Sequence, residues 1–236
     1  AERVLEIPQG LVVRHDGVRN LYHLNAVLVD RGVADAATVT RLADMHLGDL
    51  HHRHVVFDDA ELAERLAPEL LAAGWQRQRV EFMLLSGSPD RPAPHELAHE
   101  IDGAAARALQ LRLLSEEAPA VAPDGTVAEA LAELLVAGQE AIRAGTRSIC
   151  FAADDATMCT LFIDGRYAMI DEVGTLSAHR GRGLARAVVS AAIERAREER
   201  CTTIVVPADA DDWPQLLYIK LGFEPLGTQV SFTHPS

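Results

Sequence analysis

A strand, a basic glycine-rich turn and a long helix follow one another between Tyr167 and Arg200, and this stretch constrains the fold more than any other. The turn reads Arg180-Gly181-Arg182-Gly183-Leu184-Ala185. Glycine adopts positive φ angles at little cost, so several backbone N–H groups can converge on one point. The helix that begins next adds unpaired N–H groups and the positive end of its dipole, while two arginines add charge suited to phosphate oxygens. The pattern therefore predicts a cradle for an anion, best matched by a pyrophosphate, with an ordinary surface turn as the alternative.

The composition of the 236-residue chain excludes several classes of protein. Apolar residues make up 48% and charged residues 24%, as in an ordinary globular protein. The formal net charge of −13 disfavours nucleic acid and membrane surfaces as partners and agrees with an amine-bearing substrate. No N-terminal signal is visible, and no apolar run approaches the length of a membrane span. Cys150, Cys159 and Cys201 form no C-x-x-C pair, so we expect reduced thiols and a cytoplasmic location.

The first 90 residues predict alternating helices and strands. Residues 1–30 mix short apolar runs with polar breaks and predict no definite element. The elements expected after them are a helix over 35–47, a strand over 54–57, a helix from Asp58 or Asp59 to Gly74, and a strand over 79–85. Pro68 is expected to kink or split the second helix. Residues 86–95, SGSPDRPAPH, form the expected linker.

The pattern after the linker is clearer. A strand is expected over 96–101, and two helices follow, the second opening at the capping box Thr126–Glu129 and stopping at Gly145. Three antiparallel strands lead into the glycine-rich turn and its helix, and a β-branched run over 202–206 predicts a buried strand. A short helix ending at Gly222 and a hairpin over 223–232 complete the predicted order.

Two motifs in this order resemble those of the GNAT superfamily of acyl-CoA-dependent N-acetyltransferases. The R/Q-x-x-G-x-G/A loop is matched by Arg180, Gly183 and Ala185, and the L-Y-x-x-x-G-F segment by Leu217, Tyr218, Gly222 and Phe223. The resemblance covers residues 96–236 and implies an α/β (α+β) fold with a mixed, mostly antiparallel sheet flanked by helices. Residues 1–90 resemble a smaller, degenerate lobe of the same kind, since no basic glycine loop follows the strand over 79–85. An unrelated N-terminal extension is the alternative.

The resemblance implies transfer of the acetyl group of acetyl-CoA, the cosubstrate, to a primary amine of an unidentified acceptor. The loop residues Arg180, Gly181, Arg182, Gly183, Leu184 and Ala185 would bind the pyrophosphate. Val173, Thr175, Leu176 and Ser177 would lie along the pantetheine arm, pairing with its amides as an added strand does. In the family this strand parts from the one matching residues 202–206, which leaves a V-shaped opening for the thioester. Many relatives dimerise, so the resemblance also allows a homodimer.

The resemblance assigns Tyr218 as the general acid that protonates the departing thiolate. Glu172, with Asp171 as second choice, is the expected base, and a bulge in the strand would decide which of them faces the cleft. Packing of the tyrosine and solvation of the carboxylates are the alternatives. Many relatives have Asn where Asp211 stands, and a carboxylate cannot donate as Asn does. That contact is therefore in doubt, and the acidic loop serves either substrate recognition or solvation.

Two other motifs and one alternative function compete with this interpretation. His95-Glu96-Leu97-Ala98-His99 matches the H-E-x-x-H zinc signature, but the extended form of that motif fails, and we expect no metal. A dinucleotide fingerprint fails because Arg186 stands where glycine or alanine is required. A non-catalytic acyl-CoA-binding or regulatory module on the same fold is the alternative from another functional class, and the presence of Tyr218 favours the enzyme.

Overall fold

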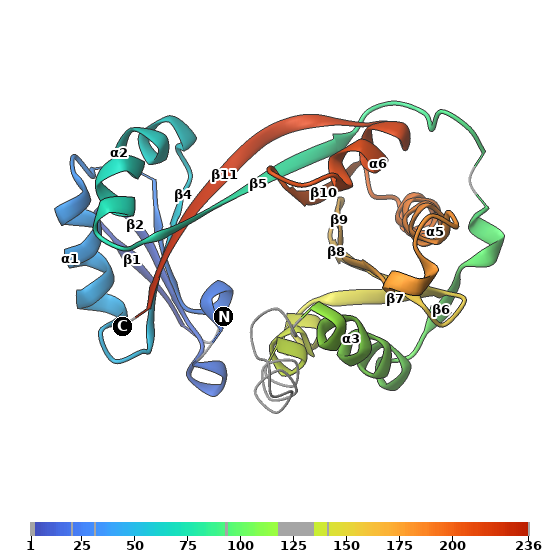
Figure 1. The fold of residues 1–236 in the computed structure, drawn as a ribbon, viewed down its shortest axis with the longest axis horizontal. Helices are drawn as coiled ribbons and strands as arrows, with labels where there is room; N and C mark the ends of the chain where they lie inside the picture. The colour runs from blue at the N-terminus through green and yellow to red at the C-terminus, as the bar shows by residue number, and fades with distance from the viewer. Residues whose placement is uncertain are drawn as a thin grey trace. The chain divides into compact units, whose positions relative to one another are not determined.

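The computed structural model describes residues 3–19, 21–30, 32–92, 94–117, 135–140 and 142–235. The chain divides into two compact units (Figure 1). The first unit comprises Ala1–Glu81, Asp209–Asp211 and Gly227–Ser236, and the second comprises Phe82–Ala208 and Asp212–Leu226. Three strands, β5 (Gln76–Leu85), β10 (Thr203–Asp209) and β11 (Phe223–Pro235), contribute residues to both units. The predicted domain limits at residues 90 and 96 stay a prediction.

The sheet of the first unit has the strand order β1-β2-β3-β4-β11-β5. Its remaining strands are β1 (Arg3–Ile7), β2 (Gly10–Arg14), β3 (Ala26–Val29) and β4 (His52–Phe57). Strands β1, β2 and β3 pair antiparallel, and β4 pairs antiparallel with β11. Strands β3 and β4 pair in parallel, which requires a crossover, and helix α1 (Ala36–Leu47) supplies it.

Both helices of the first unit begin where the sequence predicts. Asp35 accepts a hydrogen bond from the N–H of Thr38 at the start of α1, and Asp59 caps α2 (Ala60–Ala72) through the N–H of Leu62. Pro68 lies inside α2 without splitting it. The apolar side of both helices packs on one face of the sheet, and the core includes Val27, Leu47, Phe57, Leu70 and Phe232.

The sheet of the second unit has the strand order β11-β5-β10-β9-β8-β7-β6. Its further elements are β6 (His99–Ile101), α3 (Gly103–Glu117), β7 (Arg147–Ala153), β8 (Thr157–Asp164), β9 (Tyr167–Thr175), α5 (Leu184–Glu198), β10 (Thr203–Asp209) and α6 (Pro214–Lys220). Strands β6 to β9 pair antiparallel, whereas β9 and β10 pair in parallel. Residues 135–140 and 142–144 are helical.

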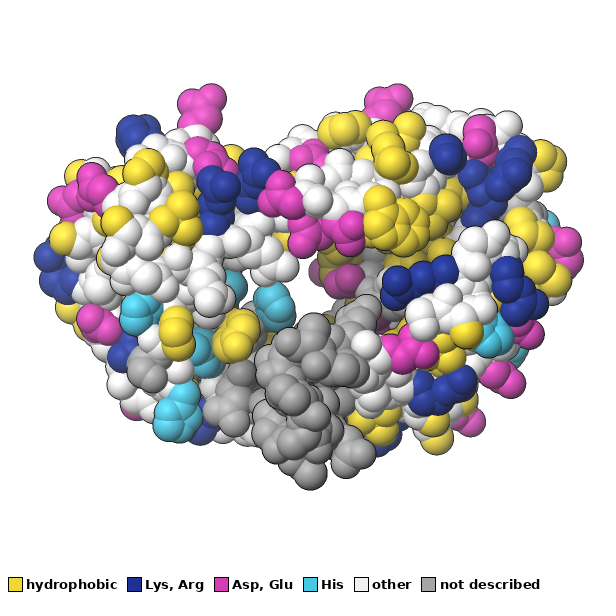
Figure 2. Space-filling view, in the orientation of Figure 1, with side chains coloured by type: hydrophobic (Ala, Val, Ile, Leu, Met, Phe, Trp, Pro, Cys, Tyr) yellow, Lys and Arg dark blue, Asp and Glu magenta, His cyan; other side chains and the backbone are white. Residues whose placement is uncertain are grey.

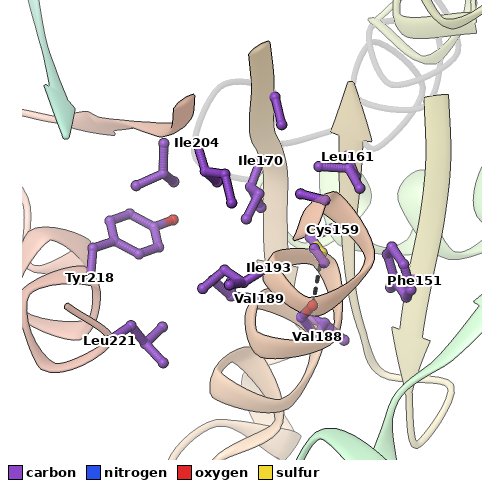
Figure 3. Packing of buried hydrophobic residues seen from close by; sticks show 14 of the residues in the cluster. Phe151, Cys159, Leu161, Ile170, Val188, Val189, Ile193, Ile204, Tyr218 and Leu221 are labelled. Carbon is purple, nitrogen blue, oxygen red and sulfur yellow. Dashed lines mark hydrogen bonds between the residues drawn. The ribbon is translucent and has the colours of Figure 1, made fainter. Parts of the chain in front are cut away.

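Helices cover both faces of the second sheet because its central strands are apolar on both sides. Along β8, Cys159 and Leu161 face α5, while Met158 faces α3, as the alternation of strand side chains requires. Val188 and Val189 of α5 pack into the larger cluster (Figure 3). Acidic and basic side chains are interspersed over the visible surface of both units (Figure 2).

The structure corrects two of the sequence-based expectations, and a third concerns residues that it does not describe. The predicted hairpin over 223–232 is wrong, because β11 is one continuous strand that finds different neighbours, β4 and β5, on its two edges. The predicted strand over 96–101 is shorter, since His95–Leu97 forms a 3-10 turn and only His99–Ile101 pairs, with β7. The capping box at Thr126 lies outside the described residues. Among those described, no helix has the length and apolarity needed to cross a membrane.

Candidate active site

Strands β9 and β10 are hydrogen bonded only where they begin. Parallel pairs join Tyr167–Met169 to Thr203–Val205, and β9 then runs on to Thr175 and β10 to Asp209 with no further pair between these two described strands. The strands therefore part beyond Met169. The facing N–H and C=O groups of two parted strands can accept another extended segment between them. This is the V-shaped opening that the resemblance implies.

The opening leads to the glycine-rich loop at the start of α5. Gly181 and Gly183 have φ angles of 77° and 81°, the left-handed conformation that glycine adopts most readily. Gly183 is the N-cap of α5, and no side chain caps this helix, so its first N–H groups are left for another acceptor. A Cβ atom added at Gly183 would meet no atom within 4 Å. The loop thus presents an open, uncapped helix N-terminus, as an anion site requires.

Two arginines of the loop already hold protein groups. The Arg180 Nε donates a hydrogen bond of 3.1 Å to the carbonyl oxygen of Thr175 at the end of β9. Arg182 forms an ion pair of 2.8 Å with Asp154 and lies 3.0 Å from the ring of His179. Both arginines remain partly exposed, so each guanidinium also has donors available to a ligand. Arg180 stiffens the corner between β9 and the loop.

Several of the predicted pantetheine contacts have partners within the protein. The N–H of Ser177 donates to the Glu116 carboxylate at 2.8 Å, and the N–H of Leu176 donates to the carbonyl oxygen of Ala156. The hydrogen bond from Ser177 is the main reason why the pKa of Glu116 is lowered, with the charge of Arg180 acting in the same direction. A ligand that pairs with the Ser177 N–H would have to displace the Glu116 carboxylate. This N–H therefore already binds an anionic group.

Strand β9 carries a bulge at Glu172. The register with β8 shifts there, and Glu172 adopts a φ of 56°, which is rare for a residue with a side chain. Its N–H donates to the neighbouring Asp171 carboxylate at 2.7 Å, and this bond stabilises the strained backbone. The alternation of the strand therefore breaks between the two carboxylates that the sequence offers as bases.

The side chain of Glu172 belongs to a buried polar network. Its Oε2 pairs with Arg143 at 2.6 Å and accepts a hydrogen bond from the Thr160 hydroxyl. Arg143 also donates to Gln110 of α3 at 3.0 Å. The side chains of Glu172 and Arg143 are 8% and 10% exposed, so the pair is largely removed from water. This network lies on the side of the sheet that α3 covers.

Tyr218 of α6 is buried in the apolar cluster under α5. Its hydroxyl is directed toward the part of β9 that carries Ile170 (Figure 3), and its ring packs edge-on against Phe223. Burial raises the pKa of this hydroxyl well above its usual value of 10, and the negative charge of Asp171 raises it further. The phenol consequently stays protonated at neutral pH. The structure brings Tyr218 and Asp171 within electrostatic reach of each other, at the point where β9 and β10 part.

Other candidate residues have different surroundings. Asp211, at the position where many GNAT proteins have Asn, belongs to the first unit and pairs with Arg79, whose hydrogen bond lowers the pKa of that carboxyl. The two histidines of the H-E-x-x-H match do not share a helix, because His95 starts a 3-10 turn and His99 starts β6. The described residues contain no group of three or more potential ligands that could hold a metal ion.

Residues 110–223 match the model of the family described as Acetyltransferase (GNAT) family. Residues 110–223, nearly all of them in the second unit, thus match a GNAT acetyltransferase domain. A search of curated proteins finds no match.

Solved structures resemble the chain over most of its length. A functionally unknown conserved protein from Staphylococcus epidermidis ATCC 12228 is 13% identical with a TM-score of 0.72, over 98% of this chain and 93% of that chain. A GCN5-related N-acetyltransferase from Kribbella flavida is 16% identical with a TM-score of 0.58, over 99% and 90%. A tandem GNAT protein from the clavulanic acid biosynthesis pathway is 16% identical with a TM-score of 0.51, over 84% and 69%. At these identities the likeness shows the fold alone, a large mixed sheet flanked by helices.

Sequence reasoning missed the residues that surround the bulge. Arg143 and Thr160 hold Glu172, and Glu116 holds Ser177, yet none of them belongs to a family motif. Arg143 stands just before the predicted helix stop at Gly145, where a basic residue is ordinary. No local pattern relates it to a strand 29 residues later.

Proposed function

We propose that the second unit transfers the acetyl group of acetyl-CoA to a primary amine of an acceptor. The observation that carries this proposal is the joining of three parts: parted strands, an uncapped glycine N-terminus and a buried tyrosine hydroxyl directed at the gap. The loop from Arg180 to Ala185 would hold the pyrophosphate by backbone N–H groups and the helix dipole. The free edges of β9 and β10 would hold the pantetheine arm.

The chemistry requires a bond from the amine nitrogen to the thioester carbonyl carbon and loss of the carbon–sulfur bond. Tyr218, which is protonated at neutral pH, would give its proton to the departing thiolate. One proton must also leave the attacking amine. We assign its acceptance to Asp171, whose charge acts on Tyr218, in preference to Glu172, whose carboxylate is held by Arg143 and Thr160. Glu172 then keeps the bulge in place.

The first unit fits a degenerate lobe that binds no cofactor. Its parallel strands β3 and β4 stay paired up to Val29 and Phe57, and the N–H of Asp58 continues the ladder to Val29. The start of α1 is capped by the Asp35 carboxylate, and this negative charge repels a phosphate. The corresponding helix start in the second unit, that of α5, has no such cap. The described residues of the first unit therefore offer neither a gap between β3 and β4 for a pantetheine arm nor an uncapped start of α1 or α2.

The test is release of free CoA from acetyl-CoA with a panel of primary amines: polyamines, amino acids, aminoglycosides and peptide N-termini. We expect turnover with at least one class, and Tyr218→Phe to lower kcat by about 100-fold or more while the acetyl-CoA Kd stays unchanged. Tyr167→Phe is the matched control, because the hydroxyl of Tyr167 contacts only Arg166 among the described hydrogen bonds. Tight binding without turnover of any amine would support the non-catalytic acyl-CoA module instead, and absence of binding would contradict both.

A further inference from the structure

A cavity of the second unit lies against α5, away from the glycine-rich loop. Its volume is about 250 Å³, and its apolar lining comes from Leu85 at the end of β5, Ile193 of α5 and Leu221 after α6. Pro89 and Pro92 of the segment 86–95 complete that lining. The cavity is smaller than the roughly 300–1,000 Å³ of sites for drug-sized ligands, so it suits a molecule of amino-acid size.

Residues 86–90, beside this cavity, are held by hydrogen bonds and an ion pair. The N–H groups of Ser86 and Gly87 donate to the carbonyl oxygen of Gly222, and the N–H of Asp90 donates to that of Lys220 at 2.9 Å. Asp90 also pairs at 2.8 Å with Arg186, whose side chain is 4% exposed. The expected linker is therefore tied to both α5 and α6 and behaves as a preformed wall, which lowers the cost of binding a ligand beside it.

Charged side chains of both signs line the cavity. Glu194 and Arg197 both line it and are three residues apart on α5, so their side chains are neighbours on the helix surface. Glu194 lies 3.5 Å from the ring of His95, which also lines the cavity. Arg197 makes no ion pair with any residue that the structure describes. An acid and an available guanidinium thus stand side by side above an apolar floor.

We propose that this cavity binds a small apolar α-amino acid as its zwitterion. Glu194 would accept the ammonium group, Arg197 and His95 would donate to the carboxylate, and the side chain would lie among Ile193, Leu221 and Pro89. A simple carboxylic acid would meet repulsion from Glu194, and a simple amine would meet repulsion from Arg197. Only a molecule that carries an ammonium group and a carboxylate on the same carbon atom satisfies both residues.

This site is separate from the glycine-rich loop. Gly183 and Arg197 stand at opposite ends of α5, roughly 20 Å apart at 1.5 Å per residue. The proposal holds whether or not the second unit transfers acetyl groups, because binding at the cavity needs neither acetyl-CoA nor Tyr218.

The test is isothermal titration calorimetry in which L-leucine, L-methionine or L-phenylalanine is added to the full chain. No acetyl-CoA is present. We expect at least one to bind, and 3-methylbutylamine and 4-methylpentanoate, which each lack one charge of leucine, to bind at least 10-fold more weakly. Glu194→Gln and Arg197→Gln should each weaken binding roughly 10-fold or more, since each removes a charged hydrogen-bond partner.

Matched controls separate this effect from general charge and stability changes. Glu198→Gln changes the same helix outside the cavity, and Arg65→Gln removes one positive charge from α2, so both should bind like the parent protein. Melting curves check that every variant folds. The proposal is overturned if none of the three amino acids binds, if the single-charge analogues bind equally well, or if the Glu194 and Arg197 variants match their controls.

Discussion

Gly183 offers the sharpest test of the proposed cofactor cradle, because its two contributions can be separated. Its φ of 81° makes any other residue strained, and alanine in this conformation costs about 1–2 kcal/mol. A Cβ there meets no atom of the protein within 4 Å, so no steric penalty is added to the folded state. We expect Gly183→Ala to lower the free energy of unfolding by only that amount, and the melting temperature by roughly 2–8 °C for a chain of this length.

The same Cβ should interfere much more strongly with cofactor binding. It would project into the open space in front of the uncapped start of α5, where the pyrophosphate oxygens would accept backbone N–H bonds. Loss of two bonds to a charged group at about 1.5 kcal/mol each amounts to a Kd for acetyl-CoA raised about 100-fold. Isothermal titration with acetyl-CoA measures the affinity, and urea unfolding measures the stability.

Gly165 provides the matched control. It has a φ of 57°, no atom within 4 Å of an added Cβ, and a place in the turn between β8 and β9. Gly165→Ala should therefore reproduce the loss of stability and leave acetyl-CoA affinity unchanged. If both variants bind the cofactor like the parent protein, or if both lose affinity equally, the placement of the pyrophosphate at Gly183 is refuted.

Two further predictions concern buried charge. Arg143→Ala should destabilise the protein by about 3–5 kcal/mol in urea unfolding, because it leaves the Glu172 carboxylate buried without its partner. The control, Arg107→Ala, breaks a half-exposed pair with Glu140 and should cost no more than about 1 kcal/mol. Equal losses of stability in the two variants would contradict the role of burial. Burial lowers the pKa of His54 to about 3, so the unfolded chain binds a proton below its pKa of 6.5 and the folded chain does not. Protonation of His54 in the unfolded chain therefore lowers the free energy of unfolding as the pH falls below 6.5, by about 2 kcal/mol at pH 5. His54→Phe should remove this part of the pH dependence. Urea unfolding at pH 7 and pH 5 measures it.

The sequence predicted those parts of the fold that local chemistry determines. Helix α1 follows Asp35, and α2 follows Asp59 and ends before Gly74, because caps and terminators act over a few residues. The left-handed conformation of Gly181 and Gly183 was likewise predictable, since it is a property of the residue type.

The elements that the sequence did not predict depend on distant partners. Strand β1 is almost entirely exposed and has no apolar alternation, so only its pairing with β2 makes it a strand. The sequence over 223–232 predicts a hairpin, but β11 is one strand. It is extended because β4 and β5 offer it two edges.

The same limit applies to the candidate site. Motif spacing brought out the loop and Tyr218, but the choice between Asp171 and Glu172 turns on a bulge at one residue. The Glu172 side chain at that bulge is bound by Arg143 and Thr160, contacts that a strand pattern cannot reveal. Side-chain networks between remote elements are set by tertiary packing, and no periodicity records them.

The part of β11 that belongs to the first unit has a consequence for how the protein is made. His54 and Thr233 form a hydrogen bond although they are 179 residues apart, and Phe232 is wholly buried in the core of the first unit. At a synthesis rate of about 5–20 residues per second, roughly 10–35 s pass between the appearance of β4 and of its partner strand. During that interval the edge of β4 lacks this neighbour, so the half that is translated first is completed last. The second unit must be synthesised before the first can finish folding.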